Sequence, residues 1–481
     1  MKQSYFKIFF AAAFISLFFS CKKYEYFQTN PNQASTATPG LLLTNICISV
    51  FDAYPTEPAF ASRQLTYYER EDQNQDYNWT RASFGNYDIL RQVARMDTLA
   101  LQANNKNYDA LAKFFRAVLF DQLSETFGDI PYSEALQGAE GNTQPKYDAQ
   151  EDVYAGILNE LEEANTLLDE ANGTISGDII YNGDITHWKK LVNAYHLRLL
   201  MDLSKRAGDS KIDIKQQFQN IISNPDKYPI MESNDDNGQI VFNSTSTSNY
   251  YPTAGYLSLG TSISMEEGFV DILKERKDPR LFSIAQPIAG LAPNVFDNYA
   301  GVNGGLTLAD QQTASADASR INSRYYDITR PVNEPLILLG YPEQEFIIAE
   351  AIARGWINGD AEQHYINGIT SSMAFYNIDV PAGYLDEPNV KYDAANAIPL
   401  IITQKYIALF MQSGWQPFYE QRRTGIPHFN VGPGTYNDRK IPKRWEYPQS
   451  EYDYNKANVE AAVQKQYNGN DDVNEVMWLI K

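Results

Sequence analysis

A pair of adjacent helix patterns near the C-terminal end constrains the fold more than any other part of the chain. Segment 341–376 reads YPEQEFIIAEAIARGWINGDAEQHYINGITSSMAFY, with apolar residues at helical spacing on both sides of a polar, Gly-containing break at 355–360. Small side chains stand where the two helices would cross, and they allow the backbones to approach closely: Ala349, Ala361 and Gly368. Because one hairpin cannot bury its own apolar face, the sequence predicts an all-α scaffold of stacked helical hairpins.

Helical patterns recur on both sides of a very different middle region. They cover residues 41–51, 86–102, 108–126, 152–168, 187–203, 401–411, 415–423 and 451–467. Between 224 and 335, Gly, Asn, Ser, Thr, Pro and Tyr dominate, and only 265–277 follows a helical pattern. So long an irregular segment in a folded chain is usually functional. We therefore expect an N-terminal helical scaffold (41–223), a large loop-rich, ligand-binding insertion with little regular strand (224–335), and C-terminal helical hairpins that complete the scaffold (336–481).

The first forty residues carry an export pattern. A charged start and the apolar run 8–19 precede Ser20 and Cys21, and the run is too short to span a bilayer. The pair Ser20-Cys21 resembles a bacterial lipobox. We therefore predict a lipoprotein signal peptide (1–20), lipidation of Cys21 and a lipid-anchored polar tether (21–40). A plain signal peptide and an uncleaved anchor are the alternatives.

Charge and cysteine content narrow the function further. The formal net charge is −20 and the Lys and Arg residues form no cluster, so nucleic acid is not expected as a partner. With Cys21 lipidated, only Cys47 remains, which leaves no intramolecular disulfide. Cys47 stands in an apolar helical run, and this position predicts a buried, inert thiol.

Motifs for catalysis or cofactor binding are missing from the sequence. The four histidines have no metal-ligand spacing, and no HExxH, GxSxG or nucleotide-binding glycine pattern stands in a fitting context. Paired carboxylates of the glycosidase kind carry no information, because 60 acidic residues make such pairs unavoidable. The acidic segment 233–238 lacks the ligand pattern of an EF-hand, and a looser calcium site stays open. No cofactor is expected.

Several arginines inside the helical blocks are expected to hold helices together. They are Arg280, Arg422, Arg423 and Arg444. We expect them to pair with carboxylates such as Glu345 or Glu350, because a guanidinium group in a packed helix needs a partner. For Arg422 and Arg423, which lie close to Glu420, binding of a phosphate or carboxylate ligand is the alternative.

Sequence blocks in a fixed order link this chain to a known family. They are NPN at 30–32, RAVLFDQLSETFGDIPYSEAL at 116–136, KDPRL at 277–281, FIIAEAIARGW at 346–356, GITSSM at 368–373, QKYIALFMQSGWQPFYEQRRTGIP at 404–427 and IPKRWEYPQSEYDYNKANVEAA at 441–462. In this order the chain resembles the SusD/RagB nutrient-binding outer-membrane lipoproteins of Bacteroidetes, specifically the SusD-like branch.

The resemblance implies a fold, a location and a partner. The fold would be an all-α, tetratricopeptide-like scaffold with a loop-rich ligand-binding part. The protein would be a lipid-anchored outer-membrane protein facing the cell exterior. It would bind an oligosaccharide or a peptide without catalysis and pass it to a SusC-like TonB-dependent transporter. A protein-binding helical-repeat adaptor and a surface glycosidase are the alternatives from other classes.

Aromatic loops supply the predicted binding residues. A sugar ring has an apolar face and a rim of hydroxyl groups, so a binder needs exposed aromatic planes beside amide or carboxylate side chains. Three loops of this Tyr-rich chain offer that combination, and ordinary packing is the alternative for each ring. The predicted ligand-binding residues are Tyr67, Tyr68, Tyr77, Asn78, Trp79, Asn249, Tyr250, Tyr251 and Tyr256.

Overall fold

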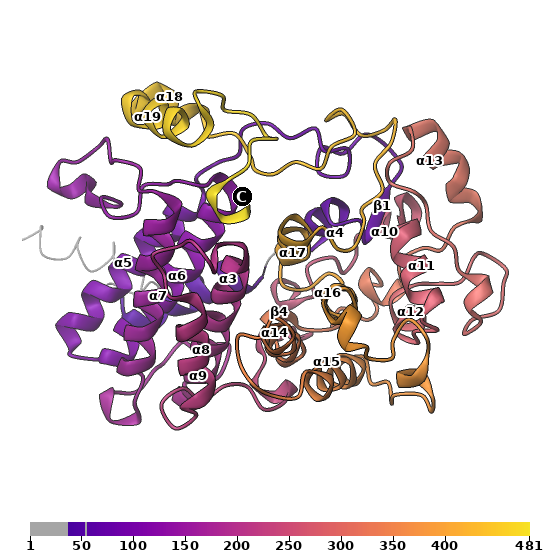
Figure 1. The fold of residues 1–481 in the computed structure, drawn as a ribbon, viewed down its shortest axis with the longest axis horizontal. Coiled ribbons are helices and arrows are strands. Elements are labelled where there is room, and N and C mark those ends of the chain that lie inside the picture. Colours follow the sequence, from indigo (N-terminus) through magenta and orange to yellow (C-terminus); the bar gives the residue numbers. More distant parts are fainter. Residues whose placement is uncertain (1–36, 53–54) are drawn as a thin grey trace, which may run out of the picture.

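Antiparallel helix pairs form the N-terminal body. The computed structural model describes residues 37–52 and 55–481, so the predicted signal peptide and Cys21 lie outside the described residues. The body contains α3 (Pro39–Phe51), α5 (Asn86–Ala103), α6 (Lys106–Phe127), α7 (Gln150–Leu167), α8 (Ile185–Asp202) and α9 (Ile214–Ser223). Each helix from α5 to α9 packs against the next, and α3 packs on α5 (Figure 1). The predicted helices in this half of the chain are confirmed.

Capping residues set the ends of α6, the longest of these helices. The Asn105 side chain accepts hydrogen bonds from the backbone amides of Asn107 and Tyr108, which satisfies donors at the helix start. Gly128 follows the last turn with φ 93°, a conformation that favours glycine. A Cβ atom at Gly128 would lie 2.4 Å from the Tyr467 hydroxyl oxygen. The glycine therefore also allows the C-terminal part of the chain to pack against the end of α6.

The C-terminal half contains the predicted hairpin and its neighbours. Its helices are α14 (Tyr341–Ala353), α15 (Ala361–Phe375), α16 (Ala397–Ala408), α17 (Gln416–Thr424), α18 (Gln449–Tyr454) and α19 (Lys456–Tyr467). Helices α14 and α15 pack against each other and both contact α16. At the crossing, a Cβ atom on Gly368 would lie 2.6 Å from a ring carbon of Phe346, so the glycine makes room for the aromatic ring. The predicted hairpin is confirmed.

Short elements make up the middle region and tie it to both flanks. The short helices are α4 (Thr56–Ala61), α10 (Ser258–Ser262), α11 (Glu267–Glu275), α12 (Arg280–Ile284) and α13 (Leu308–Ala314), and the strands are β1 (Leu65–Tyr67), β2 (Gly238–Ile240), β3 (Ile263–Met265) and β4 (Leu336–Leu339). Two antiparallel pairs join them, β1 with β3 and β2 with β4. The predicted helix at 265–277 is present as α11, but the interpretation of the rest as loop was incomplete. Helices of five to seven residues are too short to show a periodic pattern.

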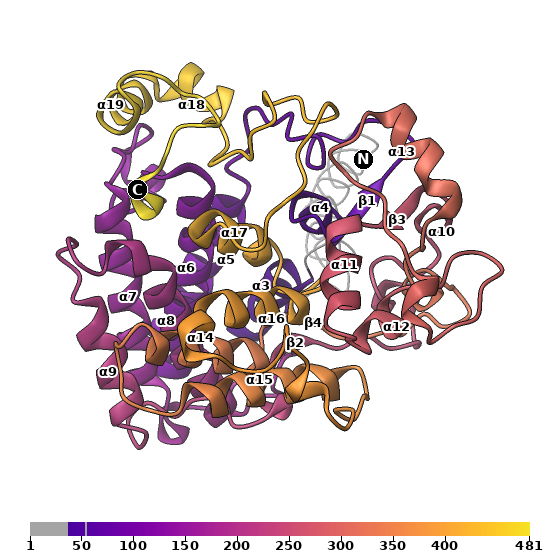
Figure 2. The same ribbon diagram turned by 45° about the vertical axis from the view of Figure 1, so that its right-hand side comes forward.

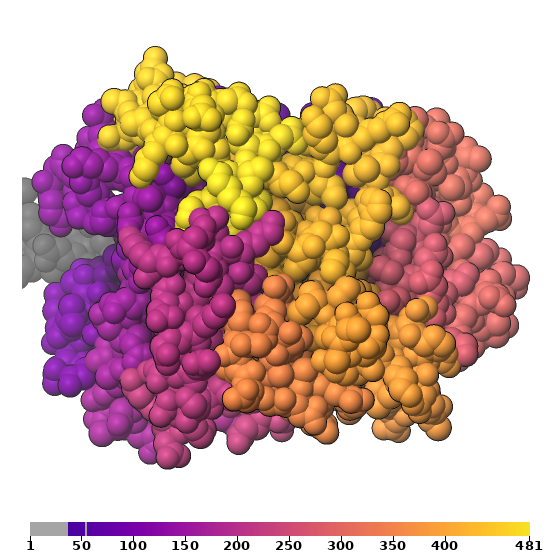
Figure 3. Space-filling view, viewed as in Figure 1, coloured from indigo at the N-terminus to yellow at the C-terminus, as the bar shows by residue number. Residues whose placement is uncertain are grey.

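The three parts of the chain lie side by side. Figure 2 shows α14 to α16 between the N-terminal body and the middle region around α11 and β3. In Figure 3 the C-terminal residues, drawn in yellow, extend over the upper edge of both the N-terminal body and the middle region. No helix within 37–52 and 55–481 combines the length and apolar character needed to cross a membrane. The predicted all-α class with little strand is confirmed.

Buried ion pairs connect the N-terminal body to the C-terminal helices. Arg198 of α8 donates to Glu343 of α14 from Nε (2.9 Å) and Nη2 (2.6 Å). Arg422 of α17 forms a second such pair with Glu125 of α6. Further buried pairs lie within the middle and C-terminal regions: Arg423 with Glu350 and Glu420, Lys405 with Glu420, Arg280 with Asp278, and Arg444 with Asp471. The prediction that arginines pair with carboxylates is confirmed, and Glu350 is one of the two partners expected. The second, Glu345, instead contacts His364 at 2.9 Å.

Two buried carboxyl groups beside these pairs bind protons unusually strongly. Asp121 accepts hydrogen bonds from the hydroxyl groups of Tyr154 (2.9 Å) and Tyr195 (2.7 Å). Burial raises the pKa of Asp121 to about 6, although the two tyrosines oppose the shift. Burial likewise raises the pKa of Glu125 to about 7 against the effect of Arg422. This region therefore holds protons more strongly in the folded state than in the unfolded chain.

The structure also shows the surroundings of Cys47 and of the acidic segment 233–238. Cys47 is a free, buried cysteine, as predicted. In the acidic segment, the Ser233 hydroxyl caps a short turn, and Lys190 donates to both carboxylate oxygens of Asp236 at 3.1 Å. This hydrogen bonding makes the segment a structural turn. Across residues 37–52 and 55–481, no cluster of three His, Cys, Asp or Glu side chains is arranged to hold a metal ion.

Replacing Arg198 by Met should destabilise the fold. The change leaves the Glu343 carboxylate, 1% exposed, with Lys405 at 3.8 Å as its only cation among the residues that the structure describes. We expect the free energy of unfolding in urea to fall by about 3–5 kcal/mol, the cost of leaving a buried charge without its main partner. Arg91→Met, which removes an exposed pair with Asp88, is the control and should change stability by less than about 0.5 kcal/mol. Equal losses in the two variants would contradict the importance of burial.

Stability should decrease as the pH rises. Asp121 and Glu125 have folded pKa values of about 6 and about 7, above their values in the unfolded chain, so the folded state binds more protons. Their contribution is complete below about pH 4 and is lost as the pH rises through 6 and 7. Asp121→Asn should reduce the fall in unfolding free energy between pH 5 and 8 by about 1.4 kcal/mol, the value of one pKa unit. Asp88→Asn, which removes an exposed carboxyl group, is the control variant.

Candidate ligand-binding cleft

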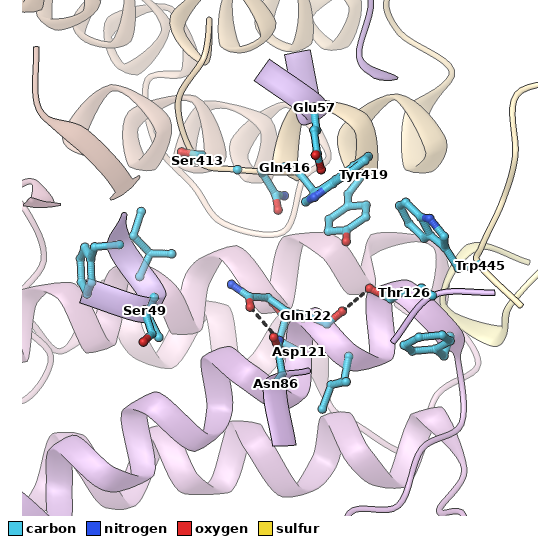
Figure 4. A pocket seen from close by; sticks show the side chains of 18 of the residues that line it. Ser49, Glu57, Asn86, Asp121, Gln122, Thr126, Ser413, Gln416, Tyr419 and Trp445 are labelled. Carbon is cyan, nitrogen blue, oxygen red and sulfur yellow. Dashed lines mark hydrogen bonds between the residues drawn. The ribbon is translucent and has the colours of Figure 1, made fainter. Parts of the chain in front are cut away.

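A cavity of about 540 Å³ lies between the N-terminal body and the C-terminal helices. Figure 4 shows Asn86, Asp121, Gln122 and Thr126 on one side of it. The residues labelled on the opposite side in Figure 4 are Glu57, Ser413, Gln416 and Tyr419. We call this cavity the cleft. Its volume falls within the range of roughly 300–1,000 Å³ that is usual for small-molecule sites.

Aromatic rings form one end of the cleft. Trp415, Trp445, Tyr419 and Phe127 contribute to its lining. Trp445 stacks on Trp79 with ring centroids 3.7 Å apart and planes 12° apart. Trp415 is perpendicular to Trp445, at 4.9 Å between centroids. We call Trp79, Trp415 and Trp445 the Trp cluster. Trp415 is its most accessible member, because Trp79 and Trp445 are both buried.

Amide groups line the cleft beside the rings. Asn86 donates from Nδ2 to Gln122 Oε1 at 2.9 Å, which positions both side chains on one wall. Across the cleft, the side-chain amide nitrogen of Gln416 donates a hydrogen bond to Asp202 Oδ1 at 3.1 Å. Aromatic faces together with amide donors and acceptors are the groups that a sugar ring needs. The cleft therefore has the chemistry to bind a polyhydroxylated ring.

Four of the predicted binding residues pack in the core: Tyr68, Tyr77, Trp79 and Tyr251. Tyr77 donates to the Ala61 carbonyl at 2.8 Å, and the Arg63 guanidinium lies 4.4 Å from its ring centroid. Tyr251 packs on Phe242 with centroids 5.5 Å apart. The expectation that these four rings form an exposed surface is wrong. Distant segments cover them, and no local sequence pattern reports such covering.

The other five predicted residues remain accessible to different degrees. Tyr67, Asn249 and Tyr250 are partly exposed, Asn78 is exposed, and Tyr256 is 52% exposed. None of the nine predicted residues, all of which are described by the structure, belongs to the lining of the cleft. Contact between these five and a ligand stays a prediction. The structure does connect one of the nine with the cleft indirectly, because Trp79 supports the ring of Trp445.

Sequence reasoning missed the residues that line the cleft. Trp415 and Trp445 lie in the blocks 404–427 and 441–462, which we had interpreted as scaffold. The available signal was that two of only six tryptophans occur in these blocks. Trp415 stands directly before α17, and Trp445 lies in the segment that leads to α18. Nothing in the sequence shows that a third, Trp79, lies beside them.

Comparisons with known proteins identify the family. Residues 31–448 match the SusD-like protein family described as "Starch-binding associating with outer membrane". A solved outer membrane protein of Bacteroides vulgatus, associated with nutrient binding, is 38% identical, with a TM-score of 0.86 over 92% of this chain and 100% of that one. Two SusD homologs of Bacteroides fragilis are 40% and 32% identical, with TM-scores of 0.85 and 0.86 over 93% and 92% of this chain and 100% of theirs. None of the curated proteins compared with the chain matches it significantly.

These matches confirm the resemblance that the ordered sequence blocks indicated. The family match covers most of the chain, and the relatives share its fold over their whole length. Proteins of this family bind their ligands without catalysis. The chain therefore belongs to the SusD-like family of nutrient-binding proteins of the outer membrane.

Proposed function

We propose that this protein binds an oligosaccharide in the cleft and passes it to a SusC-like TonB-dependent transporter. The observation that carries the proposal is the pairing of the Trp415 and Trp445 rings with the amide groups of Asn86, Gln122 and Gln416 in one cavity. Aromatic faces cover the apolar C–H surface of a sugar, and amides hydrogen-bond its hydroxyl groups. Membership in a nutrient-binding family supports the same conclusion.

A peptide ligand fits the cleft less well. Peptides are commonly bound by addition to a sheet edge, by a groove for a helix, or by capture of a charged terminus. The cleft lining comes mainly from helices, and its one strand, β4, is already paired with β2. The peptide-binding alternative is therefore retained only as an outcome of the experiment.

Surface location and delivery complete the proposal. A lipid on Cys21 would hold the protein at the outer membrane, facing the exterior, with the tether before α3. The accessible predicted residues give a second candidate surface for the ligand or the transporter: Tyr67, Asn78, Asn249, Tyr250 and Tyr256. A related structure, 24% identical, is named a chitin-binding protein, so chitin oligosaccharides belong among the ligands to be tested.

Calorimetric titration of the full-length protein with oligosaccharide and peptide panels tests the proposal. We expect at least one oligosaccharide to bind and the peptides to fail. If only peptides bind, the ligand is a peptide and the proposed sugar ligand is wrong. Silence toward both panels would contradict the proposed function.

Replacing Trp415 by Ala tests the place of binding. Loss of this half-exposed ring should weaken binding of the oligosaccharide by about tenfold or more, because the stacking face disappears. Trp478→Ala removes a ring of similar exposure outside the cleft and should leave the affinity unchanged. A double Tyr250→Ala, Tyr256→Ala variant separates the two surfaces. If it alone loses binding, the ligand lies on the loops and the assignment to the cleft is wrong.

A further inference from the structure

Few charged groups face the cleft, and acidic ones outnumber basic ones. Among the described residues that line it, the ionisable acids and bases are Glu57, Asp121 and Arg198. Two of these three carry a carboxylate. The charge that a ligand meets therefore depends on how each of the three is already paired.

Arg198 is committed to the protein. Its guanidinium donates twice to Glu343, at 2.9 and 2.6 Å, and once to the Leu338 carbonyl at 2.7 Å. It also lies 5.2 Å from the ring centroid of Tyr195, and the residue is only 3% exposed. Its positive charge is thus balanced by Glu343 within the structure. A ligand carboxylate would find no available cation among the described residues of the lining.

Glu57, unlike Arg198, is not paired within the described part of the protein. It stands in the first turn of α4, is exposed, and has no ion pair or hydrogen bond with another described residue. Figure 4 shows its carboxylate directed from α4 into the cleft, toward Gln416. Among the described residues, no cation offsets the negative charge that Glu57 presents to whatever occupies the cleft.

The surroundings add to this negative potential. Asp121 is held by tyrosine hydroxyl groups instead of a cation. The chain as a whole carries a formal charge of −20. A cleft lined by one sign of charge repels ligands of that sign and attracts the opposite one.

We propose that the cleft selects its sugar by charge, accepting neutral and amine-bearing rings and rejecting carboxylated ones, with Glu57 as the residue that determines this specificity. The inference rests on the proposed function, because it concerns the same cleft. A neutral ring uses the aromatic and amide groups alone. A protonated amine near Glu57 adds an ion pair, whereas a uronic acid brings a second carboxylate next to it without a cation to offset the repulsion.

Two matched pairs of trisaccharides test the charge selection. The first is chitotriose and its fully deacetylated triamine, and the second is trigalacturonic acid and its methyl ester. Calorimetry on the full-length protein at about pH 6.5 and low salt should show the triamine binding more tightly than chitotriose by about tenfold. The methyl ester should bind more tightly than the free acid by about the same factor. Both ratios should shrink at about 1 M salt, where charges are screened over about 3 Å.

Glu57→Gln identifies the residue responsible. Each ratio compares two sugars with closely similar rings, so differences in ring shape largely cancel. Glu57→Gln should therefore reduce both ratios to less than about threefold. Glu362→Gln is the matched control, because Glu362 is also an exposed acid in a first helical turn but lies outside the cleft. The control should keep both ratios.

Each result decides the inference. Equal binding within both pairs, or ratios that Glu57→Gln leaves unchanged, would overturn the charge selection while the binding of sugar in the cleft stands. If no trisaccharide binds and the oligosaccharide panel is also silent, both the charge selection and the proposed function fail. Tighter binding of trigalacturonic acid than of its ester would show that an arginine is free for the ligand, contrary to the geometry.

Discussion

The ion pair between Arg198 and Glu343 is the interaction on which the rest of the structure depends. It joins α8 of the N-terminal body to α14 of the C-terminal hairpin, and both side chains are buried. Neighbouring pairs from α17 to Glu125 of α6 and Glu350 of α14 continue the connection. A buried charge is stable only where its partner is held in place, so these pairs fix how the two helical halves meet. The cleft lies at this junction, and its volume follows from that fixed geometry.

The same junction explains why the site is built from distant segments. Trp79 precedes α5, Trp415 precedes α17, and Trp445 lies in the segment that crosses over to α18. The rings contact one another only because the C-terminal residues return across the N-terminal body. A stacked partner restricts the motion of a ring and so prepares its other surface for a ligand. The packing of the scaffold therefore also determines where the rings of the cleft lie.

The sequence blocks that identify the family report on the scaffold. Arg280, Arg422, Arg423 and Arg444 all lie in these blocks, and all form buried ion pairs with carboxylates. Such residues hold the fold together, whereas function depends on groups placed on the fold. Trp415 and Trp445 of the cleft lie in the same blocks, but nothing local in the sequence distinguishes them from scaffold residues.

The sequence by itself determined the helices and the manner of their packing. Hydrophobic spacing and the small Gly368 are local signals, and the hairpin of α14 and α15 formed as they predicted. Only the tertiary structure decided which aromatic residues face a ligand. Tyr77 and Trp79 have the composition of a binding loop, yet segments hundreds of residues away bury them and leave Trp415 at the cleft. Burial of a side chain depends on every segment that packs against it, and contacts between such distant segments leave no periodic trace in the chain.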